Sequence, residues 1–342
     1  MKAVIFDEHG DPEVLRYADV AEPRPRANEV LVEVRACALN HLDVWVRGGL
    51  PGIEIPLPHI LGNDIAGVVR EVGEVVDWVK AGDEVMLQPG VSCGHCRACL
   101  GGADNLCPQY DILGYRRDGG YAELVSAPAV NVIPKPKNLS WEEAAALPLV
   151  TVTAWHMLVT RAGVQPGEDV LVHAAGSGVG TIGIQIAKLR GARVIATAAS
   201  EEKLEKARSL GADEVVNYTR DDWPKEVRRL TDKKGVEVVF EHTGAATWAG
   251  SIASLAREGR LVTCGATSGF DAPTDIRQLF YRHLTFLGSF MGSKSELLDA
   301  MKFVERGQIR AVVDRTLPLA EAAHAHELMQ DRAQFGKLVL RP

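Results

Sequence analysis

The chain has 342 residues, which is enough for two domains of ordinary size. Its formal net charge of −7 and its pI near 5.8 argue against non-specific binding to nucleic acid or to an anionic membrane. The N-terminal segment MKAVIFDEHG has no apolar stretch of the secretory type, and the most apolar region, residues 144–159, is too short and too polar to span a bilayer. We therefore expect a cytoplasmic protein that binds neither nucleic acid nor membrane.

Residues 1–135 have the pattern of a domain built mainly from short β-strands. Apolar runs alternate with turn signals such as Gly82-Asp83 and Gly119-Gly120. Downstream, Ser140 and Glu143 have the spacing of a capping box, which predicts a helix over 144–147. The strand candidates of this part are 30–34, 66–69, 84–87 and 121–125.

Four of the six cysteines are clustered, at Cys93, Cys96, Cys99 and Cys107. This spacing lets one loop place four thiolates tetrahedrally around Zn²⁺, and four protein ligands leave no open position for a substrate. The lobe 93–107 is therefore predicted to hold one structural zinc. Reduced thiols without a metal, or a redox pair, are the alternatives.

From about residue 150 onward, strands and helices alternate, which predicts a doubly wound parallel sheet of about six strands. Two helices near 295–306 and 320–331 and a last strand at 337–340 are expected to return to the N-terminal domain. The strands expected in the sheet are 170–172, 193–197, 214–216, 236–240, 259–263 and 284–288.

The stretch 169–190 carries the motif that is most informative about function. An apolar strand leads into a turn of small residues, an apolar helix follows, and a second strand begins at Arg193. Small residues let the backbone approach a pyrophosphate, and free N–H groups at the helix N-terminus attract its charge. We therefore predict a bound dinucleotide, held by a turn that includes Gly178 and Val179. Two sets of residues fit the three small positions of the motif: Gly178, Gly180 and Gly183, or Ala175, Ser177 and Gly180. We prefer the second set.

The end of the second strand bears on the choice of cofactor. Enzymes that prefer NAD usually place an acidic residue there, to hold the ribose 2′-OH. This chain continues instead as Ala198-Ala199-Ser200, so no carboxylate repels a 2′-phosphate. Ser200 and Lys203 lie at the start of the next helix, where a hydroxyl, a cation and free N–H groups suit that phosphate. The sequence thus favours NADP(H) over NAD(H), with a solvated surface role for Lys203 as the alternative.

The β-rich part, the four-cysteine lobe and the dinucleotide motif, in this order, resemble the medium-chain dehydrogenase/reductase superfamily over essentially the whole chain. The cysteine spacing is similar to the structural-zinc lobe of the zinc alcohol dehydrogenases. The resemblance implies an α/β protein with a GroES-like β-rich domain at 1–150 and 291–342 and a Rossmann dinucleotide-binding domain at 151–290. It also implies an NAD(P)-dependent oxidoreductase that acts on a small molecule and forms a homodimer or homotetramer, with 284–289 as the candidate pairing strand.

The catalytic-zinc positions of those alcohol dehydrogenases carry other residue types here. By resemblance the first ligand falls at Asn40, the second at Asn63 and the third at Leu149. Amide and alkyl side chains are poor zinc ligands, so we expect no catalytic zinc from this set. The segment 40–43 with Arg47-Gly48-Gly49 instead resembles the metal-free quinone oxidoreductases, the zeta-crystallin-like branch. An unusual metal site is the alternative, built from His41, His59, Asp64 and His156.

The resemblance also implies further cofactor contacts. Thr153 is similar to the threonine under the nicotinamide, Tyr218 falls where quinone reductases place a tyrosine against the 2′-phosphate, and Lys337 resembles a late basic residue that meets the cofactor from the other domain. Thr243 and Gly265 end parallel strands, where the ligand crevice of such sheets lies. A surface role for Lys337 is the alternative.

Without a Lewis-acid metal, reduction of a simple ketone loses its charge stabilisation, whereas a quinone or an α,β-unsaturated carbonyl spreads the developing charge onto an oxygen. Amide N–H groups can hold that oxygen, and Asn40 is the first candidate, with Asn63 assisting. A role in fixing the backbone is the alternative for both. The sequence thus predicts an NAD(P)H-dependent reductase of such acceptors. The alternatives are an alcohol or aldehyde dehydrogenase with an unusual metal site, and a non-catalytic NADPH-binding protein.

Overall fold

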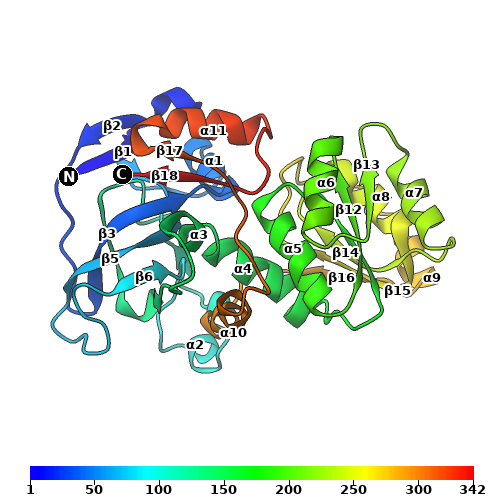
Figure 1. Cartoon of the computed structure of the whole chain (residues 1–342), viewed down its shortest axis with the longest axis horizontal. Coiled ribbons are helices and arrows are strands. Elements are labelled where there is room, and N and C mark those ends of the chain that lie inside the picture. Colours follow the sequence, from blue (N-terminus) through cyan, green and yellow to red (C-terminus); the bar gives the residue numbers. More distant parts are fainter. The chain divides into compact units, whose positions relative to one another are not determined.

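The computed structural model describes residues 1–342 and divides into two compact units (Figure 1). From the sequence, residues 291–342 are expected to belong wholly to the first domain. In the structure, helix α10 (Lys294–Glu305) is divided between the units, and most of its length groups with unit 2. None of the helices is both long enough and apolar enough to cross a membrane. Unit 1 comprises residues 1–149, 293–297 and 311–342, and unit 2 comprises 150–292 and 298–310.

Unit 1 is built mainly from strands, in agreement with the pattern of its sequence. Its largest sheet has seven strands in the order β10-β6-β5-β3-β18-β17, with β9 paired to β3 beside this path. Smaller sheets pair β2-β1-β4 and β7-β8. The strands are β1 Lys2–Phe6, β2 Arg16–Asp19, β3 Glu29–Ala38, β4 His59–Ile60, β5 Asp64–Val72, β6 Glu84–Leu87, β7 Gly90–Val91, β8 Asp111–Ile112, β9 Leu124–Pro128, β10 Val132–Pro134, β17 Val313–Pro318 and β18 Lys337–Arg341.

Unit 1 also contains short helices. The predicted capping box is present, because Ser140 Oγ accepts from Glu143 N (3.2 Å) and Glu143 Oε2 accepts from Ser140 N (2.8 Å). The helices of unit 1 are α1 His41–Gly48, α2 Arg97–Leu100, α3 Trp141–Ala145 and α11 Ala322–Gln330, with the 3₁₀ turns Pro12–Val14, Asp104–Leu106, Ala129–Asn131 and Leu319–Glu321.

Strand pairing brings residues from distant parts of the sequence to one place. The C-terminal strand β18, red in Figure 1, pairs antiparallel with the blue β3, and Val339 lies opposite Ala38. On the other side of β3, Asp64 of β5 also lies opposite Ala38. When the pairing of β3 with β18 is continued by two residues, Lys337 lies opposite Asn40. Because side chains alternate between faces, residues 40, 64 and 337 project to the same face of the sheet.

Unit 2 confirms the predicted doubly wound sheet, with six parallel strands in the order β13-β12-β11-β14-β15-β16. Leu171, Ile195 and Val239 are fully buried in its core. Helix α4 (Pro148–Trp155) continues into a π-helical turn, His156–Arg161. The remaining elements are β11 Asp169–Val172, α5 Gly178–Leu189, β12 Arg193–Ala198, α6 Glu201–Ser209, β13 Glu214–Asn217, α7 Trp223–Leu230, β14 Val236–Glu241, α8 Ala245–Ser254, β15 Leu255–Thr263, α9 Ile276–Tyr281 and β16 Thr285–Gly288.

Strand β15 begins earlier than the sequence predicts. The sequence predicts a helix over 247–257, but β15 already begins at Leu255, which pairs with Val236 of β14. Glu258 has a φ of +61°, and the register against β14 shifts at this point. The irregularity interrupts the apolar run, which is why the sequence pattern shows a strand only from Gly259 onward.

Candidate functional site

The four clustered cysteines place their sulfur atoms within 4.8 Å of one another. The Sγ–Sγ distances are 3.9 Å for Cys93 and Cys99 and 3.5 Å for Cys96 and Cys99. Sulfurs at tetrahedral positions around a zinc, each about 2.3 Å from the metal, lie about 3.8 Å apart. The cluster therefore fits a tetrahedral zinc with four thiolate ligands.

Backbone amides support negative charge on these sulfurs. Cys93 Sγ accepts an N–H from Cys96 at 3.4 Å, and Cys107 Sγ accepts from Cys93 N (3.4 Å) and Gln109 N (3.3 Å). The amide of His95 is the main cause that lowers the pKa of Cys93 to about 6. Thiolates are the form that binds zinc, so the backbone favours the metal-binding form of Cys93.

The resemblance aligns positions 40, 63 and 149 with catalytic-zinc ligands. These positions also come together in the structure, but they form hydrogen bonds and an ion pair. Asn40 Nδ2 donates to Asn63 Oδ1 (2.6 Å) and to Asp64 Oδ2 (2.8 Å). Lys337 Nζ donates to Asn40 Oδ1 (2.6 Å) and forms an ion pair with Asp64 Oδ2 (2.8 Å). The other oxygen of Asp64 accepts the backbone N–H of Leu149 (2.7 Å). These four side chains form what we call the lysine cluster: Asn40, Asn63, Asp64 and Lys337.

The lysine cluster is almost completely buried and contains a complete ion pair. Asn63 and Asp64 are fully buried, and Lys337 and Asn40 are only 3% and 7% exposed. Amide nitrogens are poor zinc ligands, and a fixed ammonium repels a divalent cation at this distance. The donor set at positions 40, 63 and 149 therefore does not suit a catalytic zinc. Nor do His41, His59 and Asp64 assemble, because the cysteine cluster is the one group of three or more potential ligands in the described chain.

Asp43 lies beneath the lysine cluster and joins it to helix α1. Its carboxylate accepts the backbone N–H groups of Asn40 (2.7 Å) and Gly62 (3.1 Å) and the Asn63 Nδ2 donor (3.0 Å). Burial raises the pKa of Asp43 to about 6, against the opposing effect of these donors and of Lys337. Asp43 thus fixes the start of α1 and the orientation of Asn63 together.

A directional chain of hydrogen bonds leads from Arg47 to Asp43. Arg47 Nη1 donates to His326 Nδ1 at 2.9 Å, and a guanidinium cannot accept, so the imidazole proton lies on Nε2. Nε2 contacts the Tyr121 hydroxyl at 3.2 Å, and that hydroxyl donates to Asp43 Oδ2 at 3.4 Å. Burial lowers the pKa of His326 to about 3, which keeps the ring neutral. The chain connects α11 and α1 to the floor of the lysine cluster.

The glycine turn of unit 2 has the geometry of a phosphate-binding loop. Ser177 caps α5, and its Oγ accepts the N–H of Gly180 at 2.8 Å. A Cβ on Gly180 would lie 2.4 Å from the backbone oxygen of Ala174, whereas one on Gly183 would meet only the Phe240 ring at 3.0 Å. Gly180 is thus a position that needs glycine for close approach, and it belongs to both sets of residues predicted from the sequence. Gly178 and Val179 hold the first amides of the helix, which have no intrahelical acceptor.

The end of β12 carries the residues predicted to meet a 2′-phosphate. Ser200 caps α6 and accepts the N–H of Lys203 at 3.3 Å. Tyr218 is brought beside this end of the strand, because its N–H donates to Ala198 O at 3.2 Å. Glu201, which also lies in the first turn, is paired with Arg220 at 2.9 Å. A serine, a lysine and a tyrosine therefore lie near a strand end that has no acidic side chain of its own.

Three further cofactor positions predicted from the sequence also lie in unit 2, whereas the fourth, Lys337, lies in unit 1. Thr153 is buried on α4, and its Oγ1 has no hydrogen-bond partner in the chain, which suits a side chain that contacts a bound group. Thr243 follows β14, and Gly265 follows β15. Both lie at the carboxyl edge of the sheet, where open α/β sheets bind ligands.

Sequence reasoning missed another buried carboxylate, Glu241, at the end of β14. Its Oε1 accepts the N–H of Thr243 (2.6 Å), and its Oε2 accepts the Ser251 hydroxyl (2.7 Å). His173 Nε2 contacts the same hydroxyl at 2.9 Å, and burial lowers the pKa of His173 to about 4. This cluster fixes the turns that follow β11 and β14. An acidic residue directly after an apolar strand was the signal that could have revealed it.

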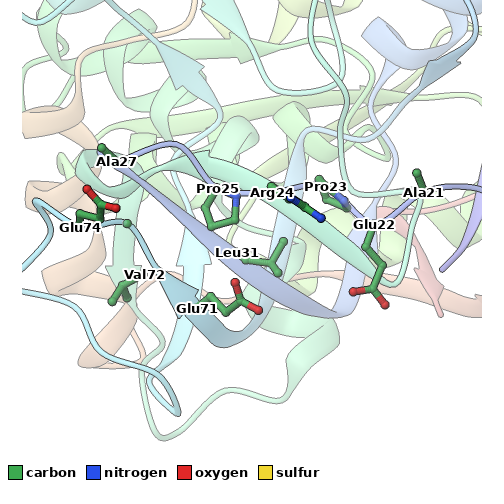
Figure 2. Close-up of a pocket in the computed structure, with 11 residues that line it drawn as sticks. Ala21, Glu22, Pro23, Arg24, Pro25, Ala27, Leu31, Glu71, Val72 and Glu74 are labelled. Carbon is green, nitrogen blue, oxygen red and sulfur yellow. The ribbon is translucent and has the colours of Figure 1, made fainter.

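A separate cavity of about 800 Å³ lies in unit 1 (Figure 2). Figure 2 shows side chains from the segment 21–27, from Leu31 of β3 and from the end of β5 around it. Its titratable groups are Arg24 and three glutamates, and none of the site residues predicted from the sequence lines it. We assign no cofactor or substrate role to this cavity.

Comparison with known proteins identifies the family. The model of the alcohol dehydrogenase GroES-like domain matches residues 26–137, and the model of the zinc-binding dehydrogenase domain matches residues 178–306. The chain belongs to the medium-chain dehydrogenase/reductase superfamily. It is therefore an NAD(P)-dependent oxidoreductase with a GroES-like domain and a Rossmann-type domain, as predicted.

Individual superfamily members match over their full length. The chain is 34% identical to the NAD-dependent alcohol dehydrogenase of Sulfurisphaera tokodaii, with 100% of both chains covered. It is 31% identical to quinone oxidoreductase 1 of Escherichia coli, with 98% of both covered. A crystal structure described as an NAD-dependent alcohol dehydrogenase matches with a TM-score of 0.97 and 55% identity over 100% of both chains. Similarity of this kind defines the superfamily and the nicotinamide cofactor, but the relatives differ in their substrates.

Proposed function

We propose that this superfamily member is an NAD(P)H-dependent reductase of quinones or α,β-unsaturated carbonyls that works without a catalytic zinc. The observation that carries the proposal is the lysine cluster. The positions aligned with zinc ligands hold two amides and a backbone N–H donor, and the cation among them is the ammonium of Lys337. The likeness to quinone oxidoreductase 1 over 98% of the chain supports the same reading.

The type of acceptor follows from the presence of the Lys337 ammonium in place of a zinc ion. A bound nicotinamide supplies a hydride, and the protein supplies position and charge. Zinc polarises an isolated carbonyl strongly enough for alcohol–ketone interconversion, but an ammonium polarises it less. A conjugated acceptor needs less help, because the charge left by hydride addition is delocalised onto an oxygen. The lysine cluster therefore suits conjugated acceptors better than simple alcohols.

Steady-state assays with and without a strong chelator test this function. We expect the protein to reduce a cyclic enone or a naphthoquinone, and we expect this activity to persist in the presence of the chelator. The assays must be short enough that the cysteine lobe does not lose its metal. Chelator-sensitive oxidation of a primary or secondary alcohol, with no enone or quinone reduction, would contradict the proposal. Tight NADPH binding without turnover of any acceptor would contradict it as well, and would indicate a non-catalytic binding protein.

An alcohol dehydrogenase is the second candidate, because the solved structure with 55% identity is described by that activity. It requires an electrophile other than zinc at positions 40, 63 and 149. Alcohol oxidation that survives removal of all exchangeable metal would support this candidate in preference to the first.

We also propose that NADPH is preferred over NADH. The absence of an acid at the end of β12 and the grouping of Ser200, Lys203 and Tyr218 support the preference, although relatives are described as NAD-dependent. A charge-assisted hydrogen bond to the 2′-phosphate contributes roughly 1.5–3 kcal/mol, so Lys203→Ala should raise the KM for NADPH about tenfold to a hundredfold. The KM for NADH should hardly change. A wild-type preference for NADH, with equal effects of Lys203→Ala on both cofactors, would show the assignment to be wrong.

For the assembly, we propose a homodimer or homotetramer in which β16 pairs with its symmetry mate. Strand β16 is at the edge of the six-stranded sheet and pairs on one side only. The preceding helix α9 exposes Ile276 (68%), Phe280 (65%) and Tyr281 (68%), so this region offers both unpaired backbone and apolar surface. Light scattering at micromolar concentration should give a dimer or a tetramer, and a monomer would contradict the proposal.

A further inference from the structure

The hydrogen bonds of the lysine cluster leave Asn40 with no donor for a substrate. Its Nδ2 carries two N–H bonds, and these go to Asn63 Oδ1 (2.6 Å) and Asp64 Oδ2 (2.8 Å). Its Oδ1 accepts from Lys337 Nζ (2.6 Å). The amide orientation follows from these partners, because the flipped amide would set its NH₂ against the ammonium and its oxygen against two other oxygens. Asn40 is therefore a positioning residue in this arrangement.

Lys337 is the member of the lysine cluster that still has a donor to give. An ammonium has three N–H bonds, and the cluster accepts two of them, at Asn40 Oδ1 and Asp64 Oδ2 (2.8 Å). The two acceptors hold Nζ in place, and the pairing of β18 with β3 fixes the backbone that carries it. The Lys337 side chain is 4% exposed, so its charge is little screened by water.

We propose that the third N–H of the Lys337 ammonium binds the carbonyl oxygen of the acceptor and balances the negative charge that hydride transfer places there. This inference rests on the proposed reductase function. It gives Lys337 a role toward the substrate, whereas the resemblance implies a contact with the cofactor. Asn40 and Asp64 then act through Lys337, by holding its ammonium in a fixed position.

The step balances for an α,β-unsaturated carbonyl. The C4–H bond of the reduced nicotinamide breaks, and the hydride forms a C–H bond at the β-carbon of the acceptor. The π electrons of the C=C bond move to form an enolate, whose oxygen carries the charge beside Lys337. The cofactor is left oxidised, and the enolate takes one proton from water. Lys337 keeps its own proton throughout and acts as an electrostatic donor.

Two variants and a matched control test the inference. Lys337→Met removes the ammonium but leaves Asp64 as an unpaired buried carboxylate. The double variant Lys337→Met/Asp64→Asn removes both charges, so it keeps the test available if the single variant folds poorly. Lys135→Met is the control, because Lys135 is also a buried lysine (6% exposed side chain) paired with a glutamate, Glu84, at 3.3 Å.

Three readouts separate a substrate role from a cofactor role: kcat with a cyclic enone and a naphthoquinone, the Kd of NADPH from nicotinamide fluorescence, and the absorbance of p-nitrophenol bound with NADP⁺. We expect kcat to fall about 10²–10³-fold in both Lys337 variants, which is the usual effect of losing an oxyanion donor. The Kd of NADPH should stay within about threefold of the wild-type value, because no cofactor contact is lost. The wild type should bind p-nitrophenol as the phenolate, and the variants should bind it mainly as the neutral phenol. Lys135→Met should match the wild type.

Two results would overturn the inference. One is a kcat within about fivefold of wild type in the folded double variant, since no oxyanion donor would then have been lost. The other is a loss confined to the Kd of NADPH, which would return Lys337 to a cofactor role. Failure of the proposed function looks different, because the wild type itself would then reduce neither acceptor. The p-nitrophenol readout needs no turnover and still decides the role of Lys337 in that case.

Discussion

The cysteine lobe and the lysine cluster correspond to two places where the zinc alcohol dehydrogenases hold a metal. In this chain the two places carry opposite kinds of side chain, metal ligands in the lobe and an ammonium in the cluster. In the lobe, four sulfurs lie within 4.8 Å of one another and accept backbone N–H groups. In the lysine cluster, an ammonium lies 2.8 Å from the carboxylate of Asp64, with amides around it. The predicted structural metal site and the proposed reaction site are thus independent parts of this fold. A chain can keep one and rebuild the other.

The independence follows from how each site is made. The lobe is one continuous loop, so its ligands depend only on local spacing. The lysine cluster is made by the ends of β3, β5 and β18, which are joined by strand pairing. A change in one therefore leaves the backbone of the other intact. The following tests sharpen or break this contrast, from the largest expected effect to the smallest.

Removing a ligand of the lobe should have the largest effect on stability. In Cys93→Ser the remaining three thiolates bind zinc more weakly, and the loop 93–107 loses its cross-link. We expect a loss of stability on the order of several kcal/mol, because structural zinc sites contribute folding energy directly. Thermal unfolding monitored by circular dichroism, with and without added zinc, measures the effect. An unchanged Tm would mean that the loop holds its fold without a metal.

Breaking the buried ion pair should come next. Lys337→Met leaves Asp64 buried without its cation and should cost about 3–5 kcal/mol, whereas the double variant with Asp64→Asn should recover most of that loss. Denaturant unfolding of the two variants gives the comparison. Equal stability of the single and double variants would mean that the carboxylate of Asp64 is not buried as the structure indicates.

The buried Asp43 should make stability depend on pH. Its pKa of about 6 in the folded chain lies above the ordinary value of 3.8, so the folded state binds its proton more tightly than the unfolded state does. This contribution is complete below about pH 4 and is lost as the pH rises through about 6, with a total on the order of 3 kcal/mol. Asp43→Asn should remove that slope, whatever its absolute stability. Urea unfolding from pH 4 to 7 measures it, and parallel curves for the two proteins would refute the shift.

The smallest effect should come from the hydrogen-bond chain below the lysine cluster. Tyr121→Phe removes the hydroxyl between His326 and Asp43 and leaves the imidazole N–H without its acceptor. We expect a loss of about 1–3 kcal/mol and no change in zinc content. A wild-type Tm for this variant would show that the chain is not needed to hold α11 against α1.

The sequence predicts the lobe well and the lysine cluster only in part, for a physical reason. Cys93, Cys96, Cys99 and Cys107 are close in sequence, so their spacing alone predicts the cluster. The same holds for the glycine turn, where Ser177 and Gly180 act within one helix start. The structure brings Asn40 and Asn63 together, but the prediction that they stand at the positions of zinc ligands rests on resemblance.

The partners of those residues could not be predicted from local pattern. Lys337 and Asn40 are separated by most of the chain, and only the register of β18 on β3 brings them together. Nothing in the 335–340 segment shows whether its lysine is solvated, meets a cofactor or pairs with Asp64. The buried chain from Arg47 to Asp43 likewise depends on the packing of α11, since His326 contacts Arg47 and Tyr121 through tertiary structure alone.

The contrast between the two sites is tested most directly by counting zinc atoms in the purified protein and in Cys93→Ser by elemental analysis. We expect one zinc per chain in the wild type and none in the variant, because the cysteine lobe fits a metal and the lysine cluster does not. Two zincs per chain in the wild type, with one retained in Cys93→Ser, would contradict a reaction site in which the Lys337 ammonium takes the place of the metal.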